Sequence, residues 1–298
     1  MTDDEHISVA DPLGRVLIIA GSDSSGGAGI QADIKACAAF GAYSMTAVTA
    51  VTAQNTQGVA RVVLMEPDMV AAQIKACVDD IGVDVVKIGM LGNAAIARAV
   101  HEAVEPLDAF VVLDPVMVAT SGDTLLEDEA VAFLNEALVP IADLVTPNVP
   151  EAALLTGLSV EDTDDLTKAG DAILEMGAYA ALMKGGHLKT KSVVDVLVSE
   201  DGANVMTGPR LQTRHTHGTG CTLASAVAAA MALGANLDEA VTSARDYVFE
   251  AIRTAPKLGH GNGPLNHGLA LPQMQGEGSE PPVDPSNPFA ALKGLQSG

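Results

Sequence analysis

Short apolar segments alternate with segments of helical period along almost the whole of this 298-residue chain. The apolar segments are rich in valine, isoleucine, leucine and alanine, and most of them lack a polar face. Such strands are typical of a parallel sheet covered by helices on both sides, because the helix that joins two parallel strands packs on the sheet. The alternation therefore predicts one open, doubly wound α/β sheet. The predicted strands are residues 16–21, 47–53, 84–91, 109–116, 144–147, 180–186 and 193–199, and the predicted helices are residues 27–40, 67–80, 93–104, 128–138, 161–176, 219–233 and 237–255.

No shift in composition interrupts this pattern, so we predict one folded domain over residues 15–271. Residues 189–212, which contain Glu-Asp-Gly at 200–202, predict a local hairpin. Residues 1–14 are expected to form a flexible N-terminus. Residues 272–298 are rich in proline, glycine and polar side chains, a composition that predicts a disordered tail.

The charge of the chain limits its partners. Its 38 Asp and Glu residues outnumber its 16 Lys and Arg residues, which gives a formal net charge of −22. Such a chain repels nucleic acids and anionic membranes at long range, so we expect neither as a main partner. The same charge repels ATP, so any phosphate site needs a local positive potential. Three widely spaced cysteines, an acidic start unlike a secretory signal and the lack of a membrane-spanning apolar run lead us to expect a cytoplasmic protein.

A glycine-rich segment follows the first predicted strand and opens a helix. Gly27, Gly29 and Ala32 fit the G-x-G-x-x-A fingerprint of dinucleotide-binding folds. That fingerprint requires an acidic residue about 20 positions later, but residues 34–65 contain none, which argues against a dinucleotide site. The segment is therefore either a tight turn or part of another ligand site. Asp33 either interacts with the helix dipole or accepts a hydrogen bond from an amine of a small ring.

Residues 53–58 (AQNTQG) predict an uncharged loop after the second strand. Gln54 and Asn55 offer paired donors and acceptors that suit a neutral heterocycle with ring nitrogens. An ordinary turn is the alternative explanation of the same residues.

The segment around residues 216–234 predicts an anion site. Gly218, Thr219 and Gly220 precede a long apolar helix, where backbone N–H groups bind anions without any positively charged side chain. Cys221 falls in the first turn, where the helix dipole is expected to lower the thiol pKa, so that a thiolate can accept a proton from an attacking hydroxyl. A small buried hydrophobic residue is the alternative for Cys221. His215 and His217 lack a third ligand and are poor metal candidates.

Several polar residues follow the later strands. Asp114, Asn148 and Glu151 are hard oxygen ligands of the kind that hold Mg²⁺, although helix capping also explains the last two. Lys184 stands at a strand end beside two glycines, where it can reach phosphates or remain a solvated charge. The loop within residues 113–126 is a candidate lid.

Seven motifs resemble, in sequence and in order, those of the hydroxymethylpyrimidine/phosphomethylpyrimidine kinases of thiamine biosynthesis. That family belongs to the ribokinase-like superfamily and is close to the pyridoxal kinases. The resemblance covers residues 15–267. The motifs are GSDSSGGAGIQADIKACAAFGAY, TAQNTQGV, KIGMLG, VLDPVM, TPNVPEA, LMKGGH and THGTGCTLASA.

The resemblance implies a ribokinase-like three-layer α/β/α sandwich with a central, mostly parallel sheet, a homodimer, and the use of ATP and Mg²⁺. The implied reaction phosphorylates 4-amino-5-hydroxymethyl-2-methylpyrimidine and then phosphorylates the monophosphate to the diphosphate. A pyridoxal or pyridoxine kinase is the alternative enzyme, because its substrate is a similar ring with a hydroxymethyl group. A non-catalytic sensor of the pyrimidine phosphate is the alternative outside enzymes.

The resemblance also implies roles for individual residues. Asp33 and Gln54 would pair with the amine and a ring nitrogen of the pyrimidine, and Cys221 stands where sugar-kinase relatives have a catalytic aspartate. The pyrimidine would be surrounded by Gly21, Asp33, Gln54 and Met90, the anion hole formed by Gly218 and Gly220, the ATP phosphates held by Lys184, Thr216 and Thr219, and Mg²⁺ held by Asp114 and Glu151.

Overall fold

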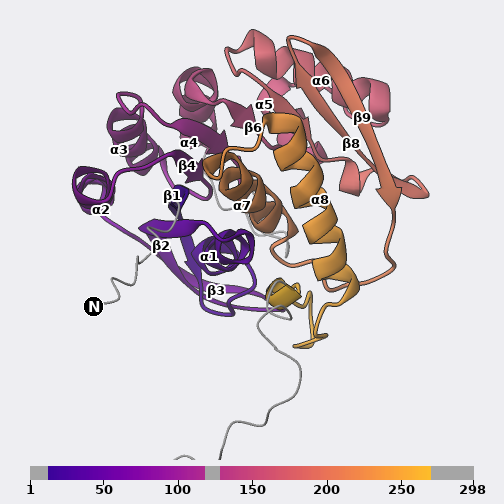
Figure 1. The fold of residues 1–298 in the computed structure, drawn as a ribbon, viewed down its shortest axis with the longest axis horizontal. Helices are drawn as coiled ribbons and strands as arrows, with labels where there is room; N and C mark the ends of the chain where they lie inside the picture. The colour runs from indigo at the N-terminus through magenta and orange to yellow at the C-terminus, as the bar shows by residue number, and fades with distance from the viewer. Residues whose placement is uncertain (1–12, 118–127, 270–298) are drawn as a thin grey trace, which may run out of the picture.

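The computed structural model describes residues 13–117 and 128–269, which form one nine-stranded sheet between two layers of helices (Figure 1). The strand order is β3-β2-β1-β4-β5-β6-β7-β8-β9. The six central strands, β2, β1, β4, β5, β6 and β7, are parallel to one another. At one edge of the sheet β3 pairs antiparallel with β2, and at the other edge β8 pairs antiparallel with β7 and β9 with β8. The strands are β1 (Arg15–Asp23), β2 (Tyr43–Asn55), β3 (Gly58–Leu64), β4 (Val85–Ile88), β5 (Phe110–Leu113), β6 (Leu144–Val145), β7 (Ala181–Met183), β8 (Ser192–Ser199) and β9 (Gly202–Pro209).

The two faces of the sheet bury separate hydrophobic cores. Successive side chains of a strand point to opposite faces, so Leu17 and Ile19 of β1 enter one core and Val16 and Ile18 the other. The first core is covered by α2 (Pro67–Asp80), α3 (Ala94–Val104), α4 (Asp128–Phe133), α5 (Val149–Thr156) and α6 (Thr163–Glu175). The second is covered by α1 (Gly29–Phe40), α7 (Thr219–Ala232) and α8 (Leu237–Arg253). The predicted three-layer α/β/α class with a mostly parallel sheet is confirmed.

The segment after the second predicted strand differs from the sequence-based expectation. Residues 53–55 continue β2 instead of forming a loop, and β3 returns antiparallel beside it after a short turn. Most of the β3 side chains are exposed. An exposed edge strand has no buried face to impose an apolar–polar alternation, which explains why the pattern did not predict β3. Gln54 and Asn55 are therefore held on the sheet.

The remaining predicted elements agree with the structure apart from their ends. The predicted hairpin is β8 and β9, which pair antiparallel from Ser192↔Pro209 to Ser199↔Gly202. The helix predicted over residues 128–138 leaves α-helical geometry after Phe133 and continues as a wider turn over Leu134–Leu138, before Pro140. The predicted flexible N-terminus up to residue 12, the tail over 272–298 and the lid residues 118–126 lie outside the described residues. No helix in the described ranges is long and apolar enough to cross a membrane.

Candidate active site

A cavity of about 860 Å³ opens at the carboxyl edge of the parallel strands. Ligands of open α/β sheets bind at this edge, because the strand ends and the helix starts converge there. The wall contains the ends of β1 and β2, residues that follow β4 to β7, and the starts of α1, α5 and α7. All but one of the predicted site residues belong to this wall, namely Gly21, Gln54, Met90, Asp114, Glu151, Lys184, Thr216, Gly218, Thr219, Gly220 and Cys221.

The start of α7 forms the predicted anion cradle. Gly218 precedes the helix with φ 83°, and a Cβ there would lie 1.8 Å from the carbonyl oxygen of Gly27, so the position requires glycine. The Thr219 N–H donates to the Thr216 carbonyl, and the Thr222 N–H donates to the Gly218 carbonyl. The N–H groups of the two residues in between, Gly220 and Cys221, are therefore the ones directed at an anion.

Cys221 lies where the starts of α1 and α7 meet. The backbone of Gly29, the first residue of α1, lies beside its sulfur. Burial raises the pKa of the Cys221 thiol to about 12, and the nearby Lys87 ammonium opposes this only in part. The expectation that the helix dipole lowers this pKa is therefore wrong, because desolvation of the thiolate outweighs the dipole.

Lys184 and Asp114 lie directly beside the cradle. Lys184 follows β7, and its Nζ donates to Asp114 Oδ1 at 2.9 Å and lies 3.9 Å from Glu151 Oε2. A Cβ at Gly220 would lie 3.1 Å from this Nζ, so glycine permits the close approach of Lys184 to the helix start. Thr146 Oγ1 also donates to Asp114 Oδ1. Asp114 Oδ2 is buried without a hydrogen-bond partner among the described residues, which fits a site for a cation.

Glu151 and Asn148 begin α5 as a capping box. The Asn148 side chain accepts from the Glu151 N–H, and Glu151 Oε2 accepts from the Asn148 N–H. Helix capping, the alternative to metal binding, therefore explains Asn148, because its side-chain oxygen already accepts the Glu151 N–H. Burial raises the pKa of Glu151 to about 7, with Asp114 adding to the effect and Lys184 opposing it. Within the described residues, no group of three or more His, Cys, Asp or Glu side chains has the geometry of a metal centre.

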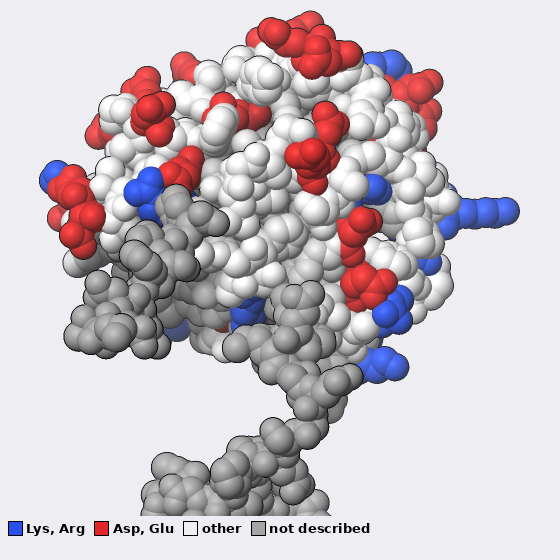
Figure 2. Space-filling model, viewed as in Figure 1, with Lys and Arg blue, Asp and Glu red and all other residues white. Residues whose placement is uncertain are grey.

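Lys184 and the α7 N–H groups are the sources of positive potential at this end of the cavity, beside the Asp114 and Glu151 carboxylates. Lys184 lies within residues 181–194 and the start of α7 within residues 202–237, and neither stretch of the sequence contains Asp or Glu. Figure 2 shows acidic side chains in separate groups over the outer surface of one face, interspersed with Lys and Arg. The net charge of −22 is therefore compatible with an anion site in the cavity.

The part of the cavity at the ends of β1 and β2 is lined by apolar and amide groups, with the Asp23–His217 pair beside them. A Cβ at Gly21 would lie 3.0 Å from Met90 Cε, so the two residues predicted to contact a ring are in contact with each other. Gln54, at the end of β2, completes this apolar and amide-lined end. All three residues line the cavity, and their predicted contact with a pyrimidine ring stays a prediction.

Asp33 is the predicted site residue that does not belong to the cavity wall. Its side chain is completely buried, and both carboxylate oxygens accept hydrogen bonds from Lys87 Nζ at 3.1 Å. Ser225 Oγ of α7 donates to the same carboxylate at 2.7 Å. Burial alone would lower the pKa of Lys87, but the charge and hydrogen bond of Asp33, together with the nearby Cys221 and Asp114, outweigh burial and raise it. The structure places Asp33 below the cavity, and its predicted contact with the substrate stays a prediction.

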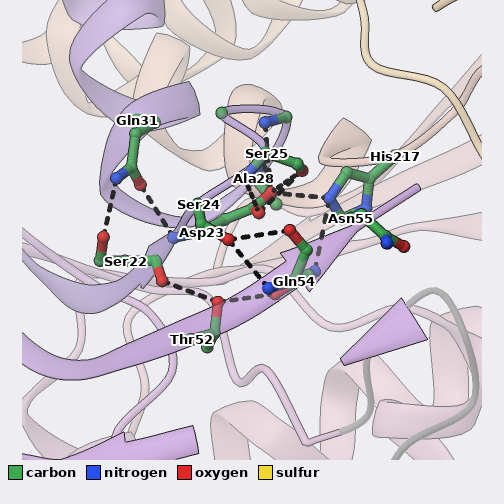
Figure 3. Close-up of polar contacts among 12 residues, drawn as sticks. Ser22, Asp23, Ser24, Ser25, Ala28, Gln31, Thr52, Gln54, Asn55 and His217 are labelled. Atoms are coloured by element: carbon green, nitrogen blue, oxygen red, sulfur yellow. Dashed lines mark hydrogen bonds and ion pairs between the residues drawn. The ribbon is translucent and has the colours of Figure 1, made fainter. Parts of the chain in front are cut away.

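Two residues that the sequence did not single out as ligands, Asp23 and His217, join the glycine-rich segment to the cradle (Figure 3). Asp23 Oδ2 accepts from His217 Nε2 at 2.8 Å and from the backbone N–H of Ala28 at 2.9 Å. Burial by itself would raise the pKa of Asp23, but hydrogen bonds from His217 and Ser25 lower it to about 2. The order Asp-Ser-Ser-Gly is typical of an Asp-stabilised turn and was the available signal for Asp23.

Comparison with known proteins agrees with this geometry. The family described as phosphomethylpyrimidine kinase matches residues 23–266. A hydroxymethylpyrimidine/phosphomethylpyrimidine kinase of Streptomyces coelicolor is 48% identical over 263 residues, which are 88% of this chain and 97% of the relative. The Escherichia coli enzyme of the same name is 46% identical over 257 residues, which are 85% of this chain and 97% of the relative.

Solved structures show the same fold. A phosphomethylpyrimidine kinase from Clostridium difficile is 42% identical, with a TM-score of 0.72 over 80% of this chain and 99% of that chain. An ADP complex of Bacillus subtilis pyridoxal kinase is 37% identical, with a TM-score of 0.81 over 87% of this chain and 99% of that chain. The sequence match, the order of the strands and the residues gathered at the cavity lead to one conclusion: this chain belongs to the phosphomethylpyrimidine kinase family.

Proposed function

We propose that this protein phosphorylates 4-amino-5-hydroxymethyl-2-methylpyrimidine with ATP, and then phosphorylates the monophosphate to the diphosphate, in thiamine biosynthesis. One observation carries the proposal: a single cavity joins an apolar, amide-lined end to an anion cradle. The apolar and amide-lined end suits a neutral ring, and the cradle suits phosphates. Cys221 lies between them. Its neighbour Gly29 packs on Gly21, and the adjacent Gly220 packs on Lys184.

The chain's own groups account for the positioning and the charge that phosphoryl transfer requires. Lys184 and the N–H groups of Gly220 and Cys221 would hold the transferred phosphoryl group and stabilise the charge that develops on it. Thr216 and Thr219 belong to the same loop and helix start. The second reaction needs the same cradle, because its acceptor is itself a phosphate.

We also propose that Asp114 and Glu151 hold Mg²⁺, which would neutralise charge on the ATP phosphates. The unpartnered Asp114 Oδ2 supports this assignment. Glu151 supports it as well, because burial raises its pKa to about 7, and a bound cation would offset the cost of its buried negative charge. Two carboxylates suit a cation that takes its other ligands from water and substrate phosphates.

Cys221 is proposed as the group that accepts the proton of the attacking hydroxyl. With a pKa near 12 it rests as a thiol, so this role requires that the bound substrates favour the thiolate. If Cys221 is the base, Cys221→Ala retains binding of the pyrimidine alcohol and loses most of its turnover. Normal turnover of Cys221→Ala would assign the catalytic effect to the cradle alone.

The edge strand β3 supports a homodimer. Val62, Val63 and Leu64 are consecutive exposed apolar residues on this strand, and Val51 on the neighbouring β2 is exposed as well. An unpaired apolar edge is a surface that a second copy can cover. We further propose that the protein is cytoplasmic, in keeping with its three free cysteines.

Substrate preference tests the proposed function. Purified protein is assayed for ADP release with ATP, Mg²⁺ and either the hydroxymethylpyrimidine or pyridoxine. We expect kcat/KM for the pyrimidine to exceed that for pyridoxine at least about tenfold, because a site built to hydrogen-bond one ring discriminates against another. A preference for pyridoxine would favour a pyridoxal-type kinase, and binding of the pyrimidine without ADP release would favour a sensor.

A further inference from the structure

Asp23, His217 and Gln54 form a polar cluster at the amide-lined end of the cavity, and the proposed phosphoryl transfer uses neither Asp23 nor His217. Asp23 is the last residue of β1, Gln54 lies one residue before the end of β2, and His217 lies in the loop before α7. In Figure 3 the His217 ring reaches across to Asp23, and the Gln54 side chain lies beside the same ring nitrogen. The cluster therefore connects the ring-binding residue to both glycine-rich segments.

Asp23 is surrounded by hydrogen-bond donors. Its Oδ2 accepts from His217 Nε2, Ser25 Oγ and the N–H groups of Gly27 and Ala28, and its Oδ1 accepts from the Ser25 N–H and Oγ. A carboxylate bound in this way is ionised and accepts only. The hydrogen of the neighbouring imidazole nitrogen is therefore on Nε2 and directed at Asp23.

The position of His217 is fixed on all sides. Its side chain is 7% exposed, and its backbone N–H donates to the Gly263 carbonyl at 3.1 Å. A Cβ at Gly27 would lie 2.5 Å from His217 Cδ2, so the ring packs directly on the glycine-rich segment. The ring has no room to turn away from Asp23, and it keeps one orientation toward the cavity.

Gln54 is held by its backbone and by its side-chain amide. Its N–H donates to Ser24 Oγ, and Ser24 Oγ donates to its carbonyl, both at 2.8 Å. Its amide group lies 3.2 Å from Thr52 Oγ1, whose hydrogen is donated to the Ser22 carbonyl, and 3.5 Å from His217 Nε2. Because His217 Nε2 carries a hydrogen and Thr52 Oγ1 is left as an acceptor, both neighbours are satisfied when the amide oxygen faces His217 and the amide nitrogen donates to Thr52. The second amide hydrogen is left for an acceptor in the cavity.

We propose that His217, held by Asp23, is a positioning residue that sets the Gln54 amide so that its N–H group meets an acceptor nitrogen of the substrate ring. This role rests on the proposed function. It predicts that the identity of residue 217 affects recognition of the ring and leaves the binding of ATP unchanged. His217 acts through Gln54 and does not contact the reacting atoms.

The test compares kinetics of His217→Leu and His217→Asn in the wild-type and Gln54→Ala backgrounds. Leucine keeps the bulk and removes the donor, whereas asparagine keeps a donor for Asp23. We expect His217→Leu to raise KM for the pyrimidine alcohol about tenfold, His217→Asn to raise it less, and KM for ATP to stay within about twofold. In the Gln54→Ala background, His217→Leu should cause no further change in kcat/KM, because the two residues act as a unit.

Controls separate positioning from general damage. His260→Leu makes the same exchange at an exposed histidine and should leave both KM values unchanged. If His217→Leu lowers kcat/KM equally in the wild-type and Gln54→Ala backgrounds, the proposal is overturned. A rise in KM for ATP that parallels the rise in KM for the pyrimidine alcohol would also overturn it. If a thermal melt shows that His217→Leu is not folded, the same comparison of kcat/KM is made with His217→Asn in the wild-type and Gln54→Ala backgrounds. Wild-type protein without ADP release would instead contradict the proposed function itself.

Discussion

At the residue scale, Cys221 shows how tertiary burial changes the chemistry that local sequence suggests. A cysteine in the first turn of a helix is expected to have a lowered pKa. The first turn is where the structure places Cys221, yet burial raises its pKa to about 12. Burial causes this rise, the charges of Asp33 and Asp114 add to it, and both carboxylates come from distant parts of the chain. A sequence pattern predicts the position of this thiol but not its ionisation.

Alkylation of Cys221 by iodoacetamide tests the raised pKa. Because only the thiolate reacts, the rate should keep rising with pH through pH 10 without a plateau. Mass spectrometry of the peptide that contains Cys221 follows this residue separately from Cys37 and Cys77. A plateau between pH 6 and pH 8 would show a stabilised thiolate and contradict the structure.

Gly218 is the residue at which the cradle depends on glycine. Gly218→Ala should lower the free energy of unfolding by about 3 kcal/mol, since the left-handed backbone and the contact with the Gly27 carbonyl both oppose a Cβ. Gly234→Ala is the matched control, because its φ is 92° but no atom lies within 4 Å of its Cβ position. Gly234→Ala should lower the free energy of unfolding by only about 1 kcal/mol. Chemical denaturation measures both values, and equal losses would show that the contact with Gly27 is unimportant.

At the element scale, the fold was largely predictable because strands and helices buried in two cores carry clear periods. β1 alternates between the cores, and the capping box of α5 is visible as Asn148 and Glu151. The exposed strand β3 carries no such pattern. The site was predictable in part, because parallel strands bring Gly21, Asp114 and Lys184 to one edge. The ion pair between Lys87 and Asp33 was not predictable, since Lys87 lies inside an apolar strand and Asp33 is 54 positions away in the sequence.

The edge strand β3 gives a prediction at this scale. Val63→Glu should convert a dimer into a monomer, because a charge would be buried in the proposed interface. Sedimentation velocity measures the change. Val205→Glu on β9, the strand at the other edge of the sheet, is the matched control and should leave the dimer intact. A wild-type monomer, or a dimer that Val63→Glu does not affect, would contradict the assignment of this surface.

At the scale of the whole molecule, the central claim is that one cavity serves two successive phosphoryl transfers. The ring-binding end and the cradle lie in one wall, so the monophosphate can return to the site with its phosphate as the acceptor. The acidic outer surface does not prevent this, because the positive potential is local to α7 and Lys184.

Counting phosphoryl transfers tests this claim most directly. The hydroxymethylpyrimidine is incubated with excess ATP and Mg²⁺, and the products are identified by mass spectrometry while ADP is measured. The account predicts about two ADP for each pyrimidine consumed, with the diphosphate as the final product. A reaction that stops at the monophosphate with about one ADP per pyrimidine, or that releases no ADP, would contradict it.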